Sequence, residues 1–155
     1  MTEPVVRPAT NADLLAIAEL DRECFGNPWS LELYRQELHR PFARLVVMER
    51  DGALLGLSCS WVVGDEAHLL RIATRAAVRR QGLGRRLLES VLAHVREAGC
   101  AVLLLEVAAA NLPARALYER FGFEQLAVRK AYYREPPDDA VVMQRRLSRS
   151  VTPPR

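Results

Sequence analysis

A glycine-bearing turn, Arg-Arg-Gln-Gly-Leu-Gly at residues 79–84, is the segment whose residue types point most directly to chemistry. It follows a predicted strand and opens a predicted amphipathic helix. At such a junction the first backbone N–H groups lack helical acceptors, and the positive end of the helix dipole faces outward. Glycines let the backbone approach an anion closely, and Arg79, Arg80, Arg85 and Arg86 add positive charge. The turn therefore predicts a pyrophosphate site.

The turn differs from the two commonest phosphate-binding loops. It lacks the Gly-Lys-Ser/Thr ending of a Walker loop. A predicted hairpin precedes it rather than the start of a βαβ unit, which disfavours a dinucleotide-binding fold. A glycine turn carrying solvated arginines is the simpler alternative, and the turn alone leaves that alternative open.

Composition predicts one globular domain around this turn. The chain has 155 residues, of which 50% are hydrophobic and 26% charged, which excludes a disordered or fibrous protein. The domain is expected over residues 1–147, with a disordered polar tail over 148–155. No apolar run approaches the roughly 20 residues that span a bilayer, and the first ten residues do not resemble a signal peptide. We expect a cytoplasmic protein without membrane contact.

Hydrophobic periodicity predicts the element order βααβββαβαββ, a mixed α/β sheet with helices on both faces. The near-continuous apolar run at residues 101–107 predicts a strand covered on both faces. Strands are expected at residues 5–7, 44–49, 53–63, 67–74, 101–107, 123–133 and 140–147. Helices are expected after a capping box at Thr10–Asp13, from Ser30 to His39, from the glycine turn to about Ala98, and from Asn111 to before Gly122.

Cysteine spacing and net charge exclude several classes of site. Cys24, Cys59 and Cys100 are odd in number and far apart, which fits neither a disulfide framework nor a metal site. The three histidines are equally scattered, so no metal is expected. The net charge of +3 is too small to argue for direct nucleic-acid binding.

The pattern Arg-x-x-Gly-x-Gly at residues 79–84 resembles the acetyl-CoA signature of the GNAT N-acetyltransferase superfamily, whose fold has the same element order. A narrower resemblance, to the RimI-type ribosomal-protein N-terminal alanine acetyltransferases, covers nearly the whole chain. The segments that carry it are Pro28-Trp29-Ser30, Asp65-Glu66-Ala67, Ile72-Ala73, Arg80 to Gly84, Leu105-Glu106-Val107, Asn111, Ala116 to Glu119, Gly122-Phe123 and Tyr132-Tyr133.

The resemblance implies a GNAT fold whose central strands, at 67–74 and 101–107, splay apart. It also implies acetyl-CoA as co-substrate, with its pantetheine arm beside the first of these strands, hydrogen-bonded as an added strand would be. The cofactor-binding residues implied are Ile72, Ala73, Thr74, Arg79, Arg80, Gln81, Gly82, Leu83, Gly84, Arg85 and Asn111.

The implied reaction is direct acetyl transfer to an amine in a ternary complex. An ammonium has no lone pair, so a base must first remove a proton, and Glu106 is the candidate because desolvation in an apolar strand raises a carboxyl pKa. Tyr118 is the candidate acid that protonates the leaving thiolate. The alternatives are a glutamate at an exposed strand end and a tyrosine that only packs in the core.

Trp29, Tyr132 and Tyr133 are the implied acceptor-binding residues, although each could instead serve packing. Four residues depart from the family pattern: Arg71, Thr74, Ala108 and Ala110. Two of them, Arg71 and Ala108, are expected to flank the acceptor groove, so the selectivity for the peptide stays open.

The function that the resemblance implies is acetylation of the N-terminal amine of a ribosomal protein, with alanine as the expected first residue, by a monomer or weak dimer. Two alternatives stay open at this point. One is a GNAT enzyme that acetylates a small-molecule amine or a lysine. The other is a non-catalytic acyl-CoA-binding module, against which the presence of both Glu106 and Tyr118 argues.

Overall fold

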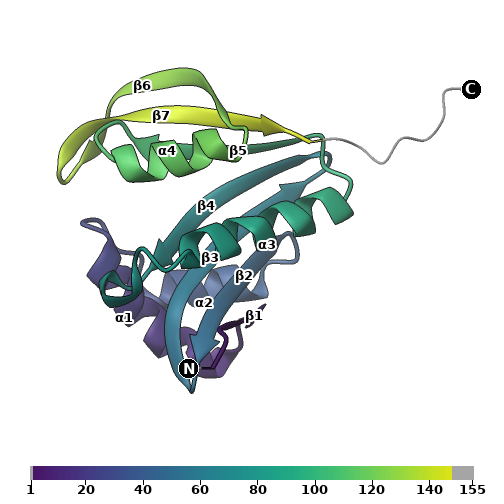
Figure 1. Ribbon diagram of the computed structural model, residues 1–155, viewed down its shortest axis with the longest axis vertical. Coiled ribbons are helices and arrows are strands. Elements are labelled where there is room, and N and C mark those ends of the chain that lie inside the picture. The colour runs from purple at the N-terminus through teal and green to yellow at the C-terminus, as the bar shows by residue number, and fades with distance from the viewer. Residues whose placement is uncertain (1, 148–155) are drawn as a thin grey trace, which may run out of the picture. The chain divides into compact units, whose positions relative to one another are not determined.

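The computed structural model describes residues 2–147, and the expected tail at 148–155 lies outside them (Figure 1). The strands are β1 (Val5–Pro8), β2 (Ala43–Arg50), β3 (Ala53–Val63), β4 (Glu66–Thr74), β5 (Val102–Ala108), β6 (Glu124–Arg134) and β7 (Pro137–Arg146). The α-helices are α1 (Leu14–Cys24), α2 (Leu31–His39), α3 (Leu83–Glu97) and α4 (Leu112–Arg120), and two short 3-10 helices span Asn11–Asp13 and Ala76–Val78. The predicted element order is confirmed.

The strands form one mixed sheet in the order β1-β2-β3-β4-β5-β7-β6. β4 and β5 pair in parallel only from Glu66↔Val102 to Leu69↔Leu105. β5 continues to Ala108 along its antiparallel partner β7. The ladder between β4 and β5 thus ends partway along both strands, as expected for a splayed central pair.

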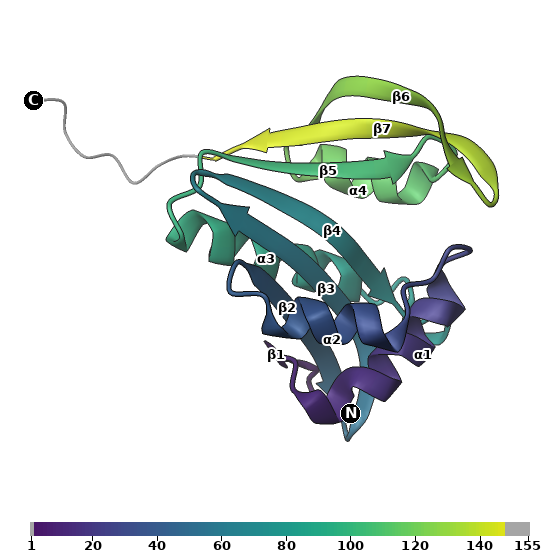
Figure 2. The same cartoon turned by 180° about the vertical axis from the view of Figure 1, so that it is seen from behind.

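Two compact units divide the chain. Unit 1 contains the residues up to Trp61 together with Leu70–Val91. Within it, α1 and α2 cover one face of the strands and α3 covers the other (Figures 1 and 2). Gly56 on β3 permits the close approach of β4 and α3, because a Cβ there would lie 2.7 Å from the Ala73 carbonyl oxygen of β4 and 2.9 Å from Leu87 Cδ1 of α3.

Unit 2 contains Val62–Leu69 and the residues from Leu92 onward, including β5, β7, β6 and α4. Along β5 the odd-numbered residues Leu103, Leu105 and Val107 are buried. Of the even-numbered residues, Glu106 is exposed and the other three are half-buried. The prediction that both faces of this strand are fully covered is therefore wrong. A run of leucines has no polar alternation, so periodicity could not distinguish the buried face from the more open one.

Local turn and capping signals account for most element boundaries. Asp51 and Gly52 both have positive φ, as a tight hairpin turn requires. Ser30 accepts the Leu33 N–H at 3.1 Å and so caps α2. The β6–β7 connection is shorter than predicted, because Pro137 already pairs with Arg134. Proline is tolerated there because it stands at the first position of the strand.

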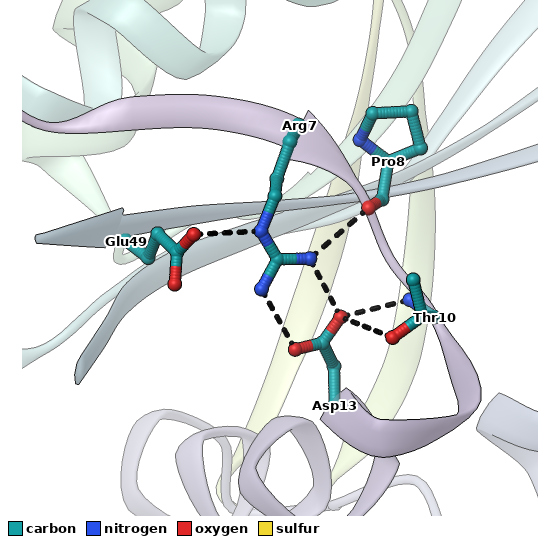
Figure 3. Close-up of polar contacts among 5 residues, drawn as sticks. All are labelled: Arg7, Pro8, Thr10, Asp13 and Glu49. Carbon is teal, nitrogen blue, oxygen red and sulfur yellow. Dashed lines mark hydrogen bonds and ion pairs between the residues drawn. The ribbon is translucent and has the colours of Figure 1, made fainter. Parts of the chain in front are cut away.

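The start of α1 is fixed by a charged contact between neighbouring elements (Figure 3). Arg7 on β1 donates from both terminal nitrogens to the Asp13 carboxylate, at 2.8 and 2.9 Å, and from Nε to Glu49 on β2 at 2.8 Å. The Thr10 N–H donates to the same Asp13 carboxylate at 2.8 Å, which is the predicted capping box with aspartate in the place of glutamate. The arginine holds the Asp13 pKa down at about 2.

Candidate active site

The glycine turn before α3 has the backbone conformation that its composition predicts. Gly82 has φ +77°, and a Cβ there would meet nothing within 4 Å, so the glycine is needed for conformation rather than for space. The first helical hydrogen bond near the turn runs from the Arg86 N–H to the Gly82 carbonyl, at 3.2 Å. The N–H groups of Leu83, Gly84 and Arg85 precede it and lack acceptors within the helix. These N–H groups are available to donate hydrogen bonds to an anion.

Three of the four arginines around this turn are already engaged within the protein. Arg79 donates from Nε to the Thr74 carbonyl at 3.3 Å. Arg85 lies 3.5 Å from Glu89, and Arg86 lies 3.0 Å from Glu3. These three guanidinium groups thus have partners within the protein, whereas the main-chain N–H groups at the start of α3 have no acceptor within the helix.

The predicted pantetheine-binding segment Ile72–Thr74 lies in unit 1, on the part of β4 that follows the last pairing with β5. Ala73 is buried, whereas Ile72 and Thr74 are half-buried. The Thr74 carbonyl also accepts the Cys24 thiol at 3.4 Å. One of the backbone acceptors expected to bind the cofactor arm is thus engaged by protein donors.

A buried polar cluster that sequence reasoning missed anchors the segment between α1 and α2. The Asp21 carboxylate is fully buried and accepts the Trp29 N–H at 2.7 Å and the Tyr34 hydroxyl. Arg71 on β4 lies 3.6 Å from this carboxylate and donates to the Asn27 carbonyl at 2.8 Å. The spacing of Leu14, Ile17, Ala18 and Asp21 was the available signal, since it places Asp21 on the buried face of α1.

Trp29 is consequently held by packing as well as by this hydrogen bond. Its ring lies 5.2 Å from that of Tyr34, and the Arg71 guanidinium lies 4.7 Å from its centroid. The same guanidinium lies 3.9 Å from the centroid of Phe25. Trp29 therefore packs against its neighbours, which is the alternative considered for it. The role of Trp29 in binding an acceptor stays a prediction.

Glu106 lies on the more open face of β5 in unit 2. Its side chain is 34% exposed, and its nearest cation is Arg129 of β6, with Nη1 3.7 Å from Oε2. The apolar strand predicted a partly desolvated carboxylate, and the side chain is partly covered. The carboxylate is accessible to an amine or a water molecule.

Tyr118 and Asn111 are positioned by the same helix, α4. Asn111 accepts the Ala114 N–H at 3.3 Å as its N-cap, which leaves its amide group able to donate elsewhere. Tyr118 is only 6% exposed and packs against Phe123, with ring centroids 5.6 Å apart. Burial raises the pKa of Tyr118 to about 12, with a smaller contribution from Tyr133. The phenol therefore keeps its proton at neutral pH.

Two aspartates at the start of β7 organise the backbone around the remaining predicted residues. Asp138 accepts the Ala110 N–H at 2.9 Å, just before Asn111. Asp139 accepts the Ala131 N–H at 2.8 Å and the Lys130 ammonium at 3.4 Å, which lowers the Asp139 pKa. Ala131 has φ +53° and lies in an irregular stretch of β6, beside the perpendicular ring pair of Tyr132 and Tyr133. Tyr132 is 47% exposed.

The sequence matches the Acetyltransferase (GNAT) family over residues 14–123. The chain belongs to the GNAT acetyltransferase family. It is 34% identical over 133 residues to the [ribosomal protein bS18]-alanine N-acetyltransferase of Escherichia coli (strain K12), a match that covers 84% of this chain and 89% of the relative.

Solved structures agree with this GNAT assignment. The crystal structure of the ribosomal-protein-S18-alanine N-acetyltransferase from Escherichia coli has a TM-score of 0.89 and 30% identity, over 96% of this chain and 97% of that one. Arabidopsis thaliana NAA60 in complex with acetyl-CoA has a TM-score of 0.82 and 18% identity, over 94% of this chain and all of that one. At 18% identity the likeness to NAA60 concerns the fold alone.

Within this GNAT acetyltransferase, the predicted site residues fall into two groups. Unit 1 contains the glycine turn, Ile72–Thr74 and Trp29, and unit 2 contains Asn111, Glu106, Tyr118 and the two tyrosines. Among residues 2–147, no group of three or more His, Cys, Asp or Glu side chains could hold a metal ion. Over the same residues, no helix is long and apolar enough to cross a membrane.

Proposed function

We propose that this GNAT acetyltransferase transfers an acetyl group from acetyl-CoA to the N-terminal amine of a ribosomal protein, with alanine as the first residue. The similarity to the bS18-alanine N-acetyltransferase of Escherichia coli carries the proposal, because it extends over most of both chains. A ribosomal acceptor implies that the reaction takes place in the cytoplasm. We further propose a single acetyltransferase domain over residues 1–147 that acts as a monomer or weak dimer.

Acetyl-CoA is the proposed donor. The N–H groups of Leu83, Gly84 and Arg85 at the start of α3 would bind its pyrophosphate, with Gly82 providing the conformation that exposes them. Ile72–Thr74 on β4 and the Asn111 amide would bind the pantetheine arm. Peptide-like hydrogen bonds along a strand edge are the kind of contact that this arm can make.

Glu106 is the proposed base and Tyr118 the proposed acid. Glu106 removes a proton from the acceptor ammonium, directly or through a water molecule, so that the neutral amine can attack the thioester carbonyl. The attack forms the carbon–nitrogen bond of a tetrahedral intermediate, whose nitrogen then loses its second proton to solvent. Collapse of the intermediate breaks the carbon–sulfur bond and releases coenzyme A as a thiolate. Tyr118 donates its phenolic proton to that sulfur; the phenol is protonated at neutral pH and so holds the proton that this step needs.

The decisive experiment incubates the protein with acetyl-CoA and short peptides that differ at the first residue, and reads acetylation by mass spectrometry. A gain of one acetyl group at the N-terminal amine of the alanine peptide is expected, and the same peptide with a blocked N-terminus but a free lysine should not react. Turnover of lysine side chains or polyamines without any N-terminal product would instead support a different GNAT activity. Coenzyme A binding without turnover of any amine would indicate a non-catalytic module.

A further inference from the structure

Arg129 is the cation that contacts Glu106, the proposed base. It lies on β6, which is separated from β5 by β7. Glu106 on β5 and Ala127 on β6 both pair with Val142 of the intervening strand β7. Directly paired residues point to the same face of an antiparallel sheet, and Arg129 shares that face because it follows Ala127 by two positions. The Arg129 side chain therefore reaches across β7, roughly 10 Å between strands, to the Glu106 carboxylate.

The Arg129 guanidinium lies between two groups that together bind cations. Its Nη1 is 3.7 Å from Glu106 Oε2, and its central carbon is 5.5 Å from the centroid of the Tyr132 ring. A carboxylate beside an aromatic face is a combination that binds ammonium as well as guanidinium groups. An acceptor amine arrives as an ammonium and must give its proton to Glu106, so it requires the same carboxylate.

The contact is weak enough to be displaced. The Arg129 side chain is 59% exposed and that of Glu106 is 34% exposed, so both charges keep much of their hydration. Exposed ion pairs of this kind contribute little stability, and a long arginine side chain loses rotamer freedom in making one. A contact of this strength cannot hold the carboxylate rigidly, and it can yield to an incoming cation.

We propose that Arg129 is an internal stand-in for the acceptor ammonium. In the free protein its guanidinium occupies the carboxylate and the Tyr132 face, and it leaves when the N-terminal ammonium of the acceptor binds there. This inference rests on the proposed function, and it adds that Arg129 competes with the acceptor. β6 departs from regular pairing with β7 directly after Arg129. In this irregular stretch the Ala131 N–H donates to the Asp139 carboxylate.

The test compares Arg129→Gln with Arg146→Gln. Arg146 is 80% exposed, lies on the same sheet and pairs with Glu124 at 4.0 Å, so its replacement removes the same charge without touching Glu106. Calorimetry measures the dissociation constant of the alanine peptide from the protein saturated with coenzyme A. Arg129→Gln should tighten binding of the peptide about two- to fivefold, the range of an exposed ion pair, and Arg146→Gln should not. The difference should shrink at high salt.

Arg129→Gln should leave the dissociation constant of coenzyme A unchanged. Unchanged or weaker peptide binding together with a lower kcat would overturn the inference, because it would make Arg129 a residue that positions Glu106. Equal tightening in both variants would also overturn it, since only overall charge would then matter. A wild-type protein that acetylates no N-terminal peptide contradicts the proposed function instead, and mass spectrometry of the wild-type reaction separates these two failures.

Discussion

Tyr118 and Glu106 occupy opposite environments, and each environment suits the role proposed for it. Tyr118 is 6% exposed, and burial raises its pKa to about 12, so the proton that the leaving thiolate needs is retained at assay pH. Glu106 is exposed on the open face of β5, where an ammonium can reach it. Residue types and the family resemblance were enough to nominate both side chains. The exposure of Glu106 was not predictable, because periodicity does not show which face of a nearly all-apolar strand is covered.

Replacing Tyr118 by phenylalanine should lower kcat by about 100-fold or more, the usual range for loss of a general acid. The packing against Phe123 is retained in this variant, so the dissociation constant of coenzyme A should hardly change. Steady-state kinetics and calorimetry check the two expectations. In the wild type, no decline in kcat due to Tyr118 should occur below about pH 11, because an acid with a pKa of about 12 is lost only above that pH. Unaltered turnover in the variant would remove Tyr118 from the mechanism.

Replacing Glu106 by glutamine should reduce kcat/KM most strongly at low pH. An α-amino group has a pKa of roughly 8, so the acceptor needs a base below that pH and much less help above it. The ratio of wild-type to variant kcat/KM, measured from pH 6 to pH 9.5, should therefore fall as the pH rises. A ratio that is constant over this range would indicate that Glu106 positions the acceptor rather than deprotonating it.

At the scale of elements, local signals predicted boundaries well and long-range contacts poorly. The caps at Ser30 and Asn111 were readable because each lies a fixed number of residues before the N–H that it accepts. The contacts of Arg71 with Asp21 and of Arg129 with Glu106 join residues far apart in the chain. No sequence spacing encodes such contacts, so the sequence alone could not reveal them.

The junction between β1 and α1 gives a pH-dependent prediction. The Asp13 side chain is 11% exposed, and its pKa falls from 3.8 to about 2 on folding because Arg7 binds the ionised form. A pKa lowered by folding stabilises the protein above the unfolded value, here by about 2 kcal/mol, and this contribution is lost as the pH falls from about 4 to 2. Urea unfolding should therefore show Asp13→Asn less stable than wild type at pH 7, with a gap that narrows toward pH 2.

The control for this junction is Arg7→Gln. It removes the partner of Asp13, so its effect on the free energy of unfolding should not add to that of Asp13→Asn. A stability gap between wild type and Asp13→Asn that is the same at pH 7 and at pH 2.5 would show that the ion pair is not its source.

At the scale of the whole molecule, the element order was predictable whereas the division into units was not. Hydrophobic periodicity gave the order, because each helix and strand has its own repeat. β3, β4 and α3 each contribute residues to both units, and no composition change marks the crossings at Trp61, Leu69 and Val91. The proposed anion-binding amides and the proposed catalytic pair fall in different units, so ligand binding and catalysis can be tested by separate substitutions.

The anion-binding role of the glycine turn is tested by comparing Gly82→Ala with Gly52→Ala. Both glycines lie in unit 1, have φ of +77° and +82°, and have nothing within 4 Å of a Cβ, so alanine imposes similar backbone strain at each. That strain should cost roughly 1–2 kcal/mol and lower Tm by a few degrees in both variants. Coenzyme A at 100 times its dissociation constant should stabilise the wild type by about 2.7 kcal/mol, a Tm increase of about 5–10 °C.

The two alanine variants should differ only in their response to coenzyme A. Gly52→Ala should keep the full increase in Tm, since the β2–β3 turn has no part in the proposed site. In Gly82→Ala, a tenfold weaker affinity would reduce the increase to about half at the same coenzyme A concentration. The reduction is expected because the N–H groups that follow residue 82 can no longer hold their conformation without strain. An equal increase in both variants, measured by differential scanning calorimetry, would mean that coenzyme A binds elsewhere, and the family resemblance would then have identified the fold but not the location of its ligand.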